Sequence, residues 1–199
     1  MINESIMPIR PLLHIEDYSL YMFIFILILT TNFAMAQGYE TQAYELIQTF
    51  SEGEIRFYPQ VMKVKTNNKS GFSSLFKYIS GNNVQQQKIA MTTPVHMDKN
   101  TGKGNMEFVL PEKFNKDKTP LPLGNDVEVY QSEAGYFAAF KFSGYTNLKK
   151  EQMVIKKGKA FLMENNISYK DSPIVLVYNS PYAFFNRKNE ILFPVYYSK

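Results

Sequence analysis

The feature that most constrains the fold of this chain is an order of predicted elements that occurs twice. Each half reads as two strands, one helix and two further strands, and a linker containing Pro120, Pro122 and Gly124 separates the halves. The predicted strands are 44–50, 54–66, 89–97 and 105–110 in the first half, and 126–132, 136–142, 173–178 and 190–197 in the second. Because neither half can close a sheet alone, we expect an α+β fold in which eight antiparallel strands form one sheet or barrel with two helices outside.

Two segments have the period of a helix that covers such a sheet. In residues 70–80, apolar side chains recur at i, i+3, i+4 and i+7, forming one stripe of Phe72, Leu75, Phe76 and Ile79. Gly81 supplies a stop signal for this helix. The second helix is predicted from Asn147 to about Glu164, with Thr146 as its cap.

The composition removes several kinds of chemistry. The 199 residues contain no Cys, and the two His residues are His14 and His96, so the sequence predicts no disulfide and no metal site. The Gly-x-Ser-x-Gly, Walker and dinucleotide-binding patterns are also missing. Glu190, Tyr58 and Tyr178 could perform acid–base chemistry, but nothing in the sequence places them together. We therefore predict that the protein is not an enzyme and has no catalytic residues.

The N-terminal segment has the pattern of a secretory signal. Residues 22–29 are uninterruptedly apolar, and Ala34-Met35-Ala36 forms a small-x-small cleavage site. The run is too short for a comfortable membrane span, which needs about 20 apolar residues. We predict a signal peptide over residues 1–36, cleavage after Ala36, and a periplasmic or secreted domain of residues 37–199 without a stable membrane span. An uncleaved anchor, or a true start at Met7 or Met22, is the alternative.

The net charge favours anionic partners. Removing residues 1–36 takes away one basic and three acidic residues, which leaves 21 basic and 15 acidic residues, a net charge of +6. The lysines do not belong to a recognised nucleic-acid motif, so we predict no nucleic-acid partner.

Two segments about 90 residues apart, together with shorter pieces between them, resemble the SOUL/heme-binding-protein family. Residues 88–95 read Lys-Ile-Ala-Met-Thr-Thr-Pro-Val and residues 184–190 read Phe-Phe-Asn-Arg-Lys-Asn-Glu. Five shorter pieces follow the family's order, at residues 55–59, 78–83, 106–111, 142–144 and 178–181. The resemblance runs from about Tyr44 to Val195. It implies a distorted eight-stranded barrel of two related ββαββ halves flanked by two helices, and non-enzymatic binding of heme or another tetrapyrrole by a carrier, buffer or scavenger.

The resemblance also implies where the ligand would lie. A tetrapyrrole would rest on the apolar face of the first helix, with basic side chains near its propionates. The matching positions here are Phe72, Leu75, Phe76, Lys77 and Lys69. A histidine that some relatives place in the Ile-Arg-x-Tyr segment is replaced by Phe57, and a second basic position is occupied by Ala183. The alternative is that the whole stripe from Phe72 to Ile79 is core.

The two long segments allow a structural and a functional interpretation each. In residues 88–95, the Thr hydroxyls could bind local backbone while proline fixes the chain, or Met91 and the threonines could line a cavity. In residues 184–190, Arg187 could pair with Glu190 and hold the last strand, or it could bind an anion. His96 is either an ordinary strand residue or an iron ligand.

Other functions remain open at this point. The two-half fold is similar to effector-binding domains related to gyrase-inhibitor-like proteins, so the ligand could be another amphipathic small molecule. A protein-interaction module is a further possibility, which a large exposed apolar patch would indicate.

Overall fold

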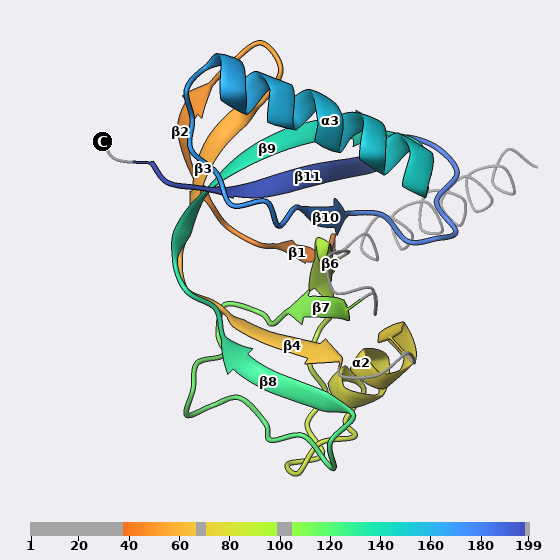
Figure 1. Ribbon diagram of the computed structural model, residues 1–199. Coiled ribbons are helices and arrows are strands. Elements are labelled where there is room, and N and C mark those ends of the chain that lie inside the picture. Colours follow the sequence, from red (N-terminus) through yellow and green to blue (C-terminus); the bar gives the residue numbers. More distant parts are fainter. Residues whose placement is uncertain (1–37, 67–70, 99–104, 198–199) are drawn as a thin grey trace, which may run out of the picture. The chain divides into compact units, whose positions relative to one another are not determined.

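A curled antiparallel sheet of nine strands forms a half-barrel in the computed structural model, with one helix against each end of the sheet (Figure 1). The neighbouring strands are, in order, β2 (Glu45–Thr49), β3 (Glu54–Tyr58), β9 (Gly135–Ser143), β11 (Lys188–Val195), β10 (Ile174–Val177), β6 (Val95–Asp98), β7 (Asn105–Val109), β4 (Met62–Thr66) and β8 (Val127–Gln131). A separate parallel pair joins β1 (Glu40–Thr41) to β5 (Thr92–Thr93). The predicted α+β class and antiparallel architecture are confirmed.

The structure describes residues 38–66, 71–98 and 105–197. The predicted signal peptide of residues 1–36 and Lys69 lie outside these described residues. From Tyr39 onward the chain forms one compact unit. None of the helices in the described part of the chain is both long enough and apolar enough to cross a bilayer.

The number of strands differs from the prediction because the expected strand 54–66 is two strands. It breaks at Pro59, which has no N–H to donate to a ladder. Before the break, β3 pairs with β2 and β9; after it, β4 pairs with β7 and β8 at the other end of the sheet. The two halves also pair differently, because β2 pairs with its own half and β8 pairs with β4 of the other. The internal repeat therefore stays a prediction.

Both helices pack on the same side of the sheet, each over its own apolar core. Helix α2 (Gly71–Ile79) packs against β4, β7 and β8. Its core contains Met62, Val64, Leu75, Tyr78, Ile79, Ile89, Phe108, Leu110, Phe114 and Val127. Helix α3 (Leu148–Glu164) packs against β9 and β11. Its core contains Ile55, Ala138, Phe140, Val154, Leu162, Val175, Ile191, Phe193 and Val195.

Local sequence explains how α3 begins and how closely it packs. The cap is Asn147 and not the predicted Thr146, because the Asn147 side chain accepts a hydrogen bond from the Lys150 N–H. At Gly158 an added Cβ would lie 2.9 Å from Phe193 and 3.0 Å from Phe140. Glycine at this position therefore lets the helix approach the two rings, despite its low helix propensity.

The opposite side of the sheet, turned away from both helices, carries many charged groups; we call it the polar face. Successive side chains of a strand point to opposite sides of the sheet. Between two apolar residues that face the helices, each strand therefore has one residue that points to the polar face. In register across β6, β10 and β11, the residues of this face are His96, Leu176 and Glu190. The same strands therefore hold apolar and ionisable residues on opposite sides.

Candidate functional site

The predicted apolar stripe of α2 faces in two directions. Leu75 is fully buried in the core, whereas Phe72 is 47% exposed and Phe76 is 50% exposed. The two Phe rings stack with centroids 5.7 Å apart and an angle of 14° between their planes. One edge of the helix therefore completes the core, and a second edge presents two stacked, half-exposed rings to solvent.

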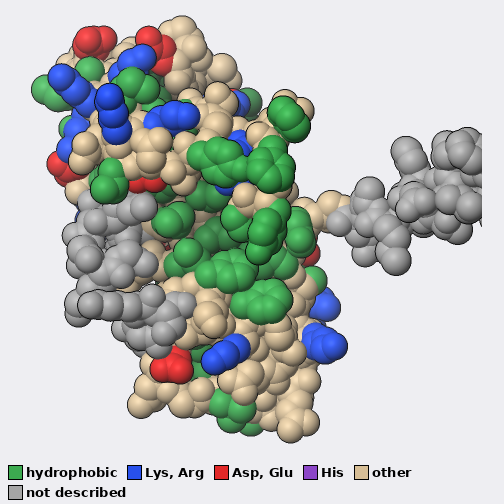
Figure 2. Space-filling model, turned by 90° about the vertical axis from the view of Figure 1, so that its right-hand side faces the viewer, with side chains coloured by type: hydrophobic (Ala, Val, Ile, Leu, Met, Phe, Trp, Pro, Cys, Tyr) green, Lys and Arg blue, Asp and Glu red, His purple; other side chains and the backbone are tan. Residues whose placement is uncertain are grey.

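A pocket of about 170 Å³, here called the α2 pocket, opens beside these rings. Its other walls are formed by the segment around β5, by β6 and by β10 with the loop that follows it. Val95 and Val177 are partners in the β6–β10 ladder, and both lie on the helix side of the sheet. The pocket is lined by Tyr39, Phe72, Phe76, Met91, Thr93, Val95, Val177, Tyr178, Asn179, Ser180 and Pro181. Figure 2 shows hydrophobic side chains gathered in a band across this face of the molecule.

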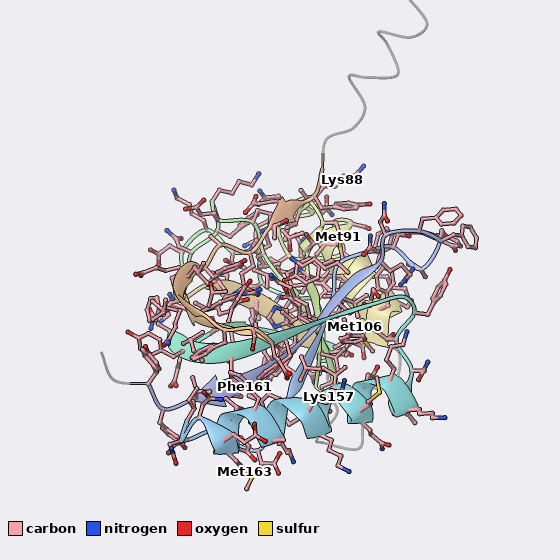
Figure 3. All side chains as sticks on the ribbon, turned by 90° about the horizontal axis from the view of Figure 1, so that it is seen from above. Lys88, Met91, Met106, Lys157, Phe161 and Met163 are labelled. Atoms are coloured by element: carbon pink, nitrogen blue, oxygen red, sulfur yellow. The ribbon has the colours of Figure 1, made fainter. Side chains whose placement is uncertain are left out.

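The hydroxyls of the Thr-Thr-Pro segment contact groups that are distant in the sequence and not the local backbone, and part of the segment lines the pocket. The Thr92 hydroxyl donates a hydrogen bond to the Val109 carbonyl in the interior. Thr93 and Met91 line the α2 pocket, and the Thr93 hydroxyl lies 3.1 Å from that of Thr41. Met91 lies on the side of the molecule away from α3 (Figure 3). The segment therefore organises strand entry and also forms a pocket wall.

The residues predicted to bind a ligand have separate positions in the structure. Phe72 and Phe76 line the α2 pocket, Leu75 is core, and Lys77 is exposed but does not line the pocket. Phe57, at the position where some relatives have histidine, packs against Tyr136. The ligand-binding role of these residues stays a prediction.

Sequence reasoning did not identify two of the pocket walls. Tyr39 precedes the recognisable motifs, so no pattern indicated it. Residues 177–181 overlap one of the family-like segments, Tyr-Asn-Ser-Pro, and that resemblance was the available signal. The position of α2 determines which side of β10 faces a cavity. The pattern of residues along β10 does not show this position.

Tyr178 connects the pocket wall to a buried ion pair on the polar face. Its hydroxyl donates to Glu190 Oε2 at 2.7 Å. Glu190 also accepts two hydrogen bonds from Arg56, at 2.8 and 2.9 Å, and both side chains are fully buried. Arg56 further donates to Glu54 at 2.8 Å and to the Tyr58 hydroxyl at 3.1 Å. This network positions Tyr178 through a bidentate, charge-assisted pair.

The same network brings together the three residues that could have performed acid–base chemistry. Burial opposes ionisation of Glu190, but hydrogen bonds from Arg56 and Tyr178 outweigh it and lower the pKa of this carboxyl below its ordinary value. Burial raises the pKa of Tyr58 to about 12 and raises that of Tyr178 further still. A fully buried, paired carboxylate and two phenols that stay protonated at neutral pH do not form an exposed acid–base site.

Arg187 does not form the predicted pair with Glu190. It precedes β11 in a loop where Asn186 has a positive φ of 51°, and Glu190 instead meets Arg56 on the polar face. The Arg187 guanidinium donates from Nη1 to the carbonyls of Ser180 and Ala183, both at 2.8 Å. It therefore closes the loop between β10 and β11.

His96 lies on the polar face, away from the α2 pocket. Its Nδ1 is 3.2 Å from Lys63 Nζ and its Nε2 is 2.9 Å from Gln42 Oε1. Burial, with a contribution from the Lys63 charge, lowers the pKa of His96 well below its ordinary value. The neutral ring therefore accepts from Lys63 at Nδ1 and donates to Gln42 from Nε2, which leaves neither nitrogen for a ligand in the pocket. Within the described ranges, no three metal-ligating side chains gather.

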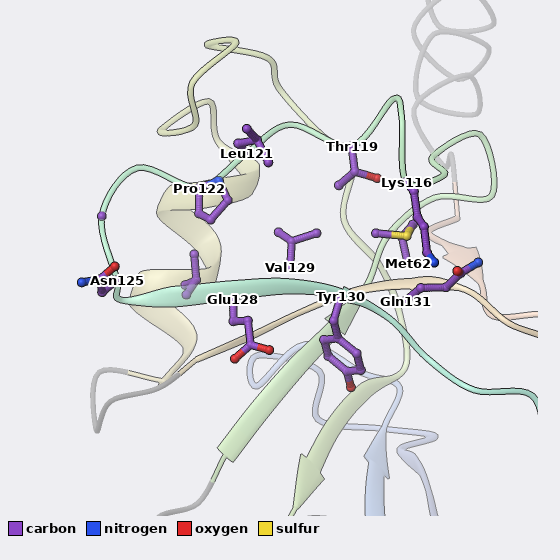
Figure 4. Close-up of a pocket in the computed structure, with 12 residues that line it drawn as sticks. Met62, Lys116, Thr119, Leu121, Pro122, Asn125, Glu128, Val129, Tyr130 and Gln131 are labelled. Carbon is purple, nitrogen blue, oxygen red and sulfur yellow. The ribbon is translucent and has the colours of Figure 1, made fainter.

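A larger groove of about 590 Å³ lies at the β8 edge of the sheet, between β8 and the linker (Figure 4). Its lining includes Met62, Lys116, Leu121, Val129 and Tyr130. The groove contains none of the residues that the sequence predicted for ligand binding. It lacks the stacked aromatic surface of the α2 pocket.

A family model and a curated relative identify the family of this chain, and solved structures share its fold. Residues 39–194 match the family model described as SOUL heme-binding protein. Heme-binding protein 2 from Homo sapiens is 28% identical over 155 residues, covering 69% of this chain and 75% of the human protein. Two solved structures share the fold at a TM-score of 0.52. The EcmrR C-terminal domain is 12% identical, covering 74% of this chain and 98% of that chain. A hydrolase from Listeria innocua is 9% identical, covering 83% of this chain and 97% of that chain.

Proposed function

This chain belongs to the SOUL heme-binding protein family, and from that premise we propose that it binds heme or a related tetrapyrrole at the α2 pocket. The observation that carries the proposal is the half-exposed, stacked pair of Phe72 and Phe76 on the pocket rim. A flat apolar macrocycle gains free energy by covering such rings, because aromatic area leaves water and the faces can stack.

The pocket volume indicates how the ligand would sit. Enclosed small-molecule sites usually have volumes of about 300–1,000 Å³, which the α2 pocket, at about 170 Å³, does not reach. One edge of the macrocycle would enter between β6, β10 and α2, and the remainder would lie over the Phe rings, with the propionates toward water. Lys77, on the last turn of α2, and Lys69 are the proposed partners of these carboxylates.

The lining also limits which residues could reach the iron. Met91 offers a thioether and Tyr39 a phenol, which are two of the side chains known as axial ligands of heme. Heme bound here would supply an iron centre with no histidine ligand from the described lining. The protein's own residues would bind and orient the ring, in keeping with a carrier, buffer or scavenger without catalysis.

Export completes the proposed role. The apolar run at residues 22–29 and the Ala34-Met35-Ala36 site support cleavage after Ala36 and a periplasmic or secreted location. A tetrapyrrole binder there would meet its ligand outside the cytoplasm.

Hemin titration of residues 37–199, followed by the Soret band, tests the binding. We expect a saturable shift at micromolar protein, and an affinity about tenfold lower for Phe72→Ala/Phe76→Ala, because two exposed aromatic faces are lost. Tyr196→Ala is the matched control, since it removes an exposed ring just beyond the C-terminal end of β11. A wild-type protein without a saturable shift would refute heme binding.

The small volume of the α2 pocket favours a second candidate, a smaller amphipathic ligand at the same place. Competition between hemin and a hydrophobic dye distinguishes the two. Displacement of the dye by hemin with a one-to-one end point supports the tetrapyrrole. Dye binding that Phe76→Ala weakens and hemin does not displace supports the alternative.

A further inference from the structure

The loop between β10 and β11 carries three large aromatic side chains that the fold does not use. Tyr182 is 83% exposed, Phe184 is 75% exposed and Phe185 is 85% exposed. They do not line the α2 pocket, whose lining from this loop ends at Pro181. Scattered exposed apolar residues are ordinary on soluble proteins, but three within four positions of one loop mark an interaction site.

Internal hydrogen bonds hold this loop in one shape. Arg187 donates to the carbonyls of Ser180 and Ala183, and the Ala183 N–H donates to the Ser180 carbonyl at 3.0 Å. At the loop's end, the Lys188 N–H donates to Asn179 Oδ1 at 2.7 Å. Because the backbone is tied down, docking of the three rings would require little ordering of the loop.

A second loop supports the first and extends the apolar surface. The Arg187 guanidinium stacks over Tyr145 with its carbon 4.2 Å from the ring centroid. Asn189 Nδ2 donates to the Gly144 carbonyl at 2.7 Å. Tyr145 and Leu148 are themselves exposed, at the start of α3. We call the combined surface the aromatic tip; it consists of Tyr145, Leu148, Tyr182, Phe184 and Phe185.

The charged residues within the two loops of the aromatic tip have one sign. Residues 143–150 and 179–189 contain Lys149, Lys150, Arg187 and Lys188 and no Asp or Glu. The acidic residues that directly follow these segments, Glu151 and Glu190, are both buried. Arg187 is itself buried, and Lys188 Nζ pairs with Glu190 at 3.5 Å. The tip therefore presents its aromatic rings beside Lys149 and Lys150, with no exposed carboxylate from its own two loops.

We propose that the aromatic tip is a peripheral docking site for the surface of an anionic lipid bilayer. Phe and Tyr rings enter the boundary between headgroups and acyl chains, and neighbouring lysines are attracted to anionic headgroups. The combination of exposed rings with Lys149 and Lys150 distinguishes this partner from a second copy of the chain, whose own tip lysines would repel it. Docking does not require the proposed ligand.

Docking at the tip would also place the α2 pocket next to the bilayer. Residues 179–181 line the pocket and lead directly into the aromatic tip. An amphipathic ring compound partitions into the same boundary zone of a membrane. A protein held there by the tip could take up or release such a compound without its crossing bulk water.

A tryptophan probe tests the docking directly, because the chain contains no Trp. We would prepare residues 37–199, which include the whole compact unit, with Phe184→Trp and, as the matched control, Tyr196→Trp. Vesicles of phosphatidylcholine with phosphatidylserine should shift the emission of Phe184→Trp to the blue and leave Tyr196→Trp unchanged. Equal shifts at both positions, or none at either, would overturn the proposal.

Vesicle sedimentation separates the contributions of rings and charges. Phe184→Ala/Phe185→Ala should lower partitioning about tenfold, since exposed rings contribute little to folding but much to insertion. Lys149→Gln/Lys150→Gln should lower binding to anionic vesicles several-fold and leave the weaker binding to pure phosphatidylcholine unchanged. Wild-type protein that fails to sediment with anionic vesicles, or that forms a dimer which the Phe184→Ala/Phe185→Ala change dissolves, would contradict membrane docking.

Discussion

The two sides of the sheet at β6, β10 and β11 use their residues in opposite ways. On the polar face, Arg56 and Glu190 are buried and bind each other. His96 is also buried and binds Lys63 and Gln42. On the helix side, Phe72 and Phe76 remain half-exposed beside a pocket. Glu190, whose chemistry could have served catalysis, therefore lies in a structural network. Phe72 and Phe76, two of the residues predicted to bind a ligand, line the pocket.

This difference shows what makes a side chain available for function. A carboxylate or imidazole can act on a ligand only if some lone pair or proton is not already committed. Glu190 receives hydrogen bonds from Arg56 and Tyr178, and His96 uses both ring nitrogens. An exposed Phe has no such requirement, because water is its only competitor.

The largest expected effect is on the polar face. Arg56→Ala removes the bidentate partner of the buried Glu190 carboxylate, which leaves only Lys188 Nζ, at 3.5 Å, as a cation beside it. The change should lower the free energy of unfolding by about 3–5 kcal/mol. Urea unfolding of residues 37–199 measures this loss. Lys159→Ala is the matched control, because it breaks the surface pair with Asp171 and should cost at most about 1 kcal/mol.

A double variant sharpens the interpretation of that result. Arg56→Leu/Glu190→Leu should be more stable than Arg56→Ala, because no unpaired charge remains. If Arg56→Ala were as stable as Lys159→Ala, the ion pair of Arg56 and Glu190 would not stabilise the fold.

The second effect compares two residues of α2. Leu75→Ala should lower the free energy of unfolding by about 2–4 kcal/mol, since it opens a cavity in a fully buried site. Phe72→Ala should cost about 1 kcal/mol or less, while weakening hemin binding. Chemical denaturation and hemin titration of both variants measure the two quantities. A Leu75→Ala variant that is as stable as the wild type but no longer binds hemin would place the ligand in the core. That result would contradict the division of α2 into a core edge and a pocket edge.

The third effect is a dependence of stability on pH. His96 is neutral in the fold because its pKa is depressed, whereas a histidine in the unfolded chain has a pKa of about 6.5. Below about pH 6.5 the unfolded chain binds more protons, so stability should fall as pH falls, by up to about 1.4 kcal/mol per pH unit. Thermal unfolding between pH 7 and pH 5 reports this slope.

His96→Gln provides the control for that slope. Residues 37–199 contain no other histidine, so the variant should lose the pH dependence in this window. The lowered pKa values of Glu54 and Glu190 act in a lower window, with stability lost as pH falls below about 4.5. The charged groups close to His96 are Lys63, at its Nδ1, and Glu107, which binds Lys63 at 3.2 Å. A slope that persists in His96→Gln would exclude His96 as its cause.

The smallest effect concerns the cation proposed for the propionates. Lys77→Gln should weaken hemin binding about two- to threefold, because an exposed lysine contributes little to an ion pair in water. Lys156→Gln, on the exposed side of α3, should leave the hemin affinity unchanged. Equal losses in the two variants would indicate a general charge effect and not a contact.

Much of the fold could be predicted from the sequence. Strand alternation, the i, i+3, i+4 stripe of α2 and the motifs of residues 88–95 and 184–190 are local patterns, and they identified the class and the family, which the comparisons confirmed. The strand count could not be predicted, because the separation of β3 from β4 at Pro59 depends on their pairing with strands from both halves. The partner of Glu190 was also missed, since Arg56 lies 134 positions away in the chain.

By itself the sequence determined which residues alternate, which segments are helical and which family the chain resembles, because these properties depend on neighbours along the chain. Only the tertiary structure decided which side of each element is covered. Helix α2 turns the edge of its stripe that carries Leu75 and Ile79 toward β4, β7 and β8. The other edge, with Phe72 and Phe76, stays at the pocket. The sheet, in turn, brings Arg56 to Glu190 and Lys63 to His96, because burial of an ionisable group is stable only beside a partner that the distant strand supplies.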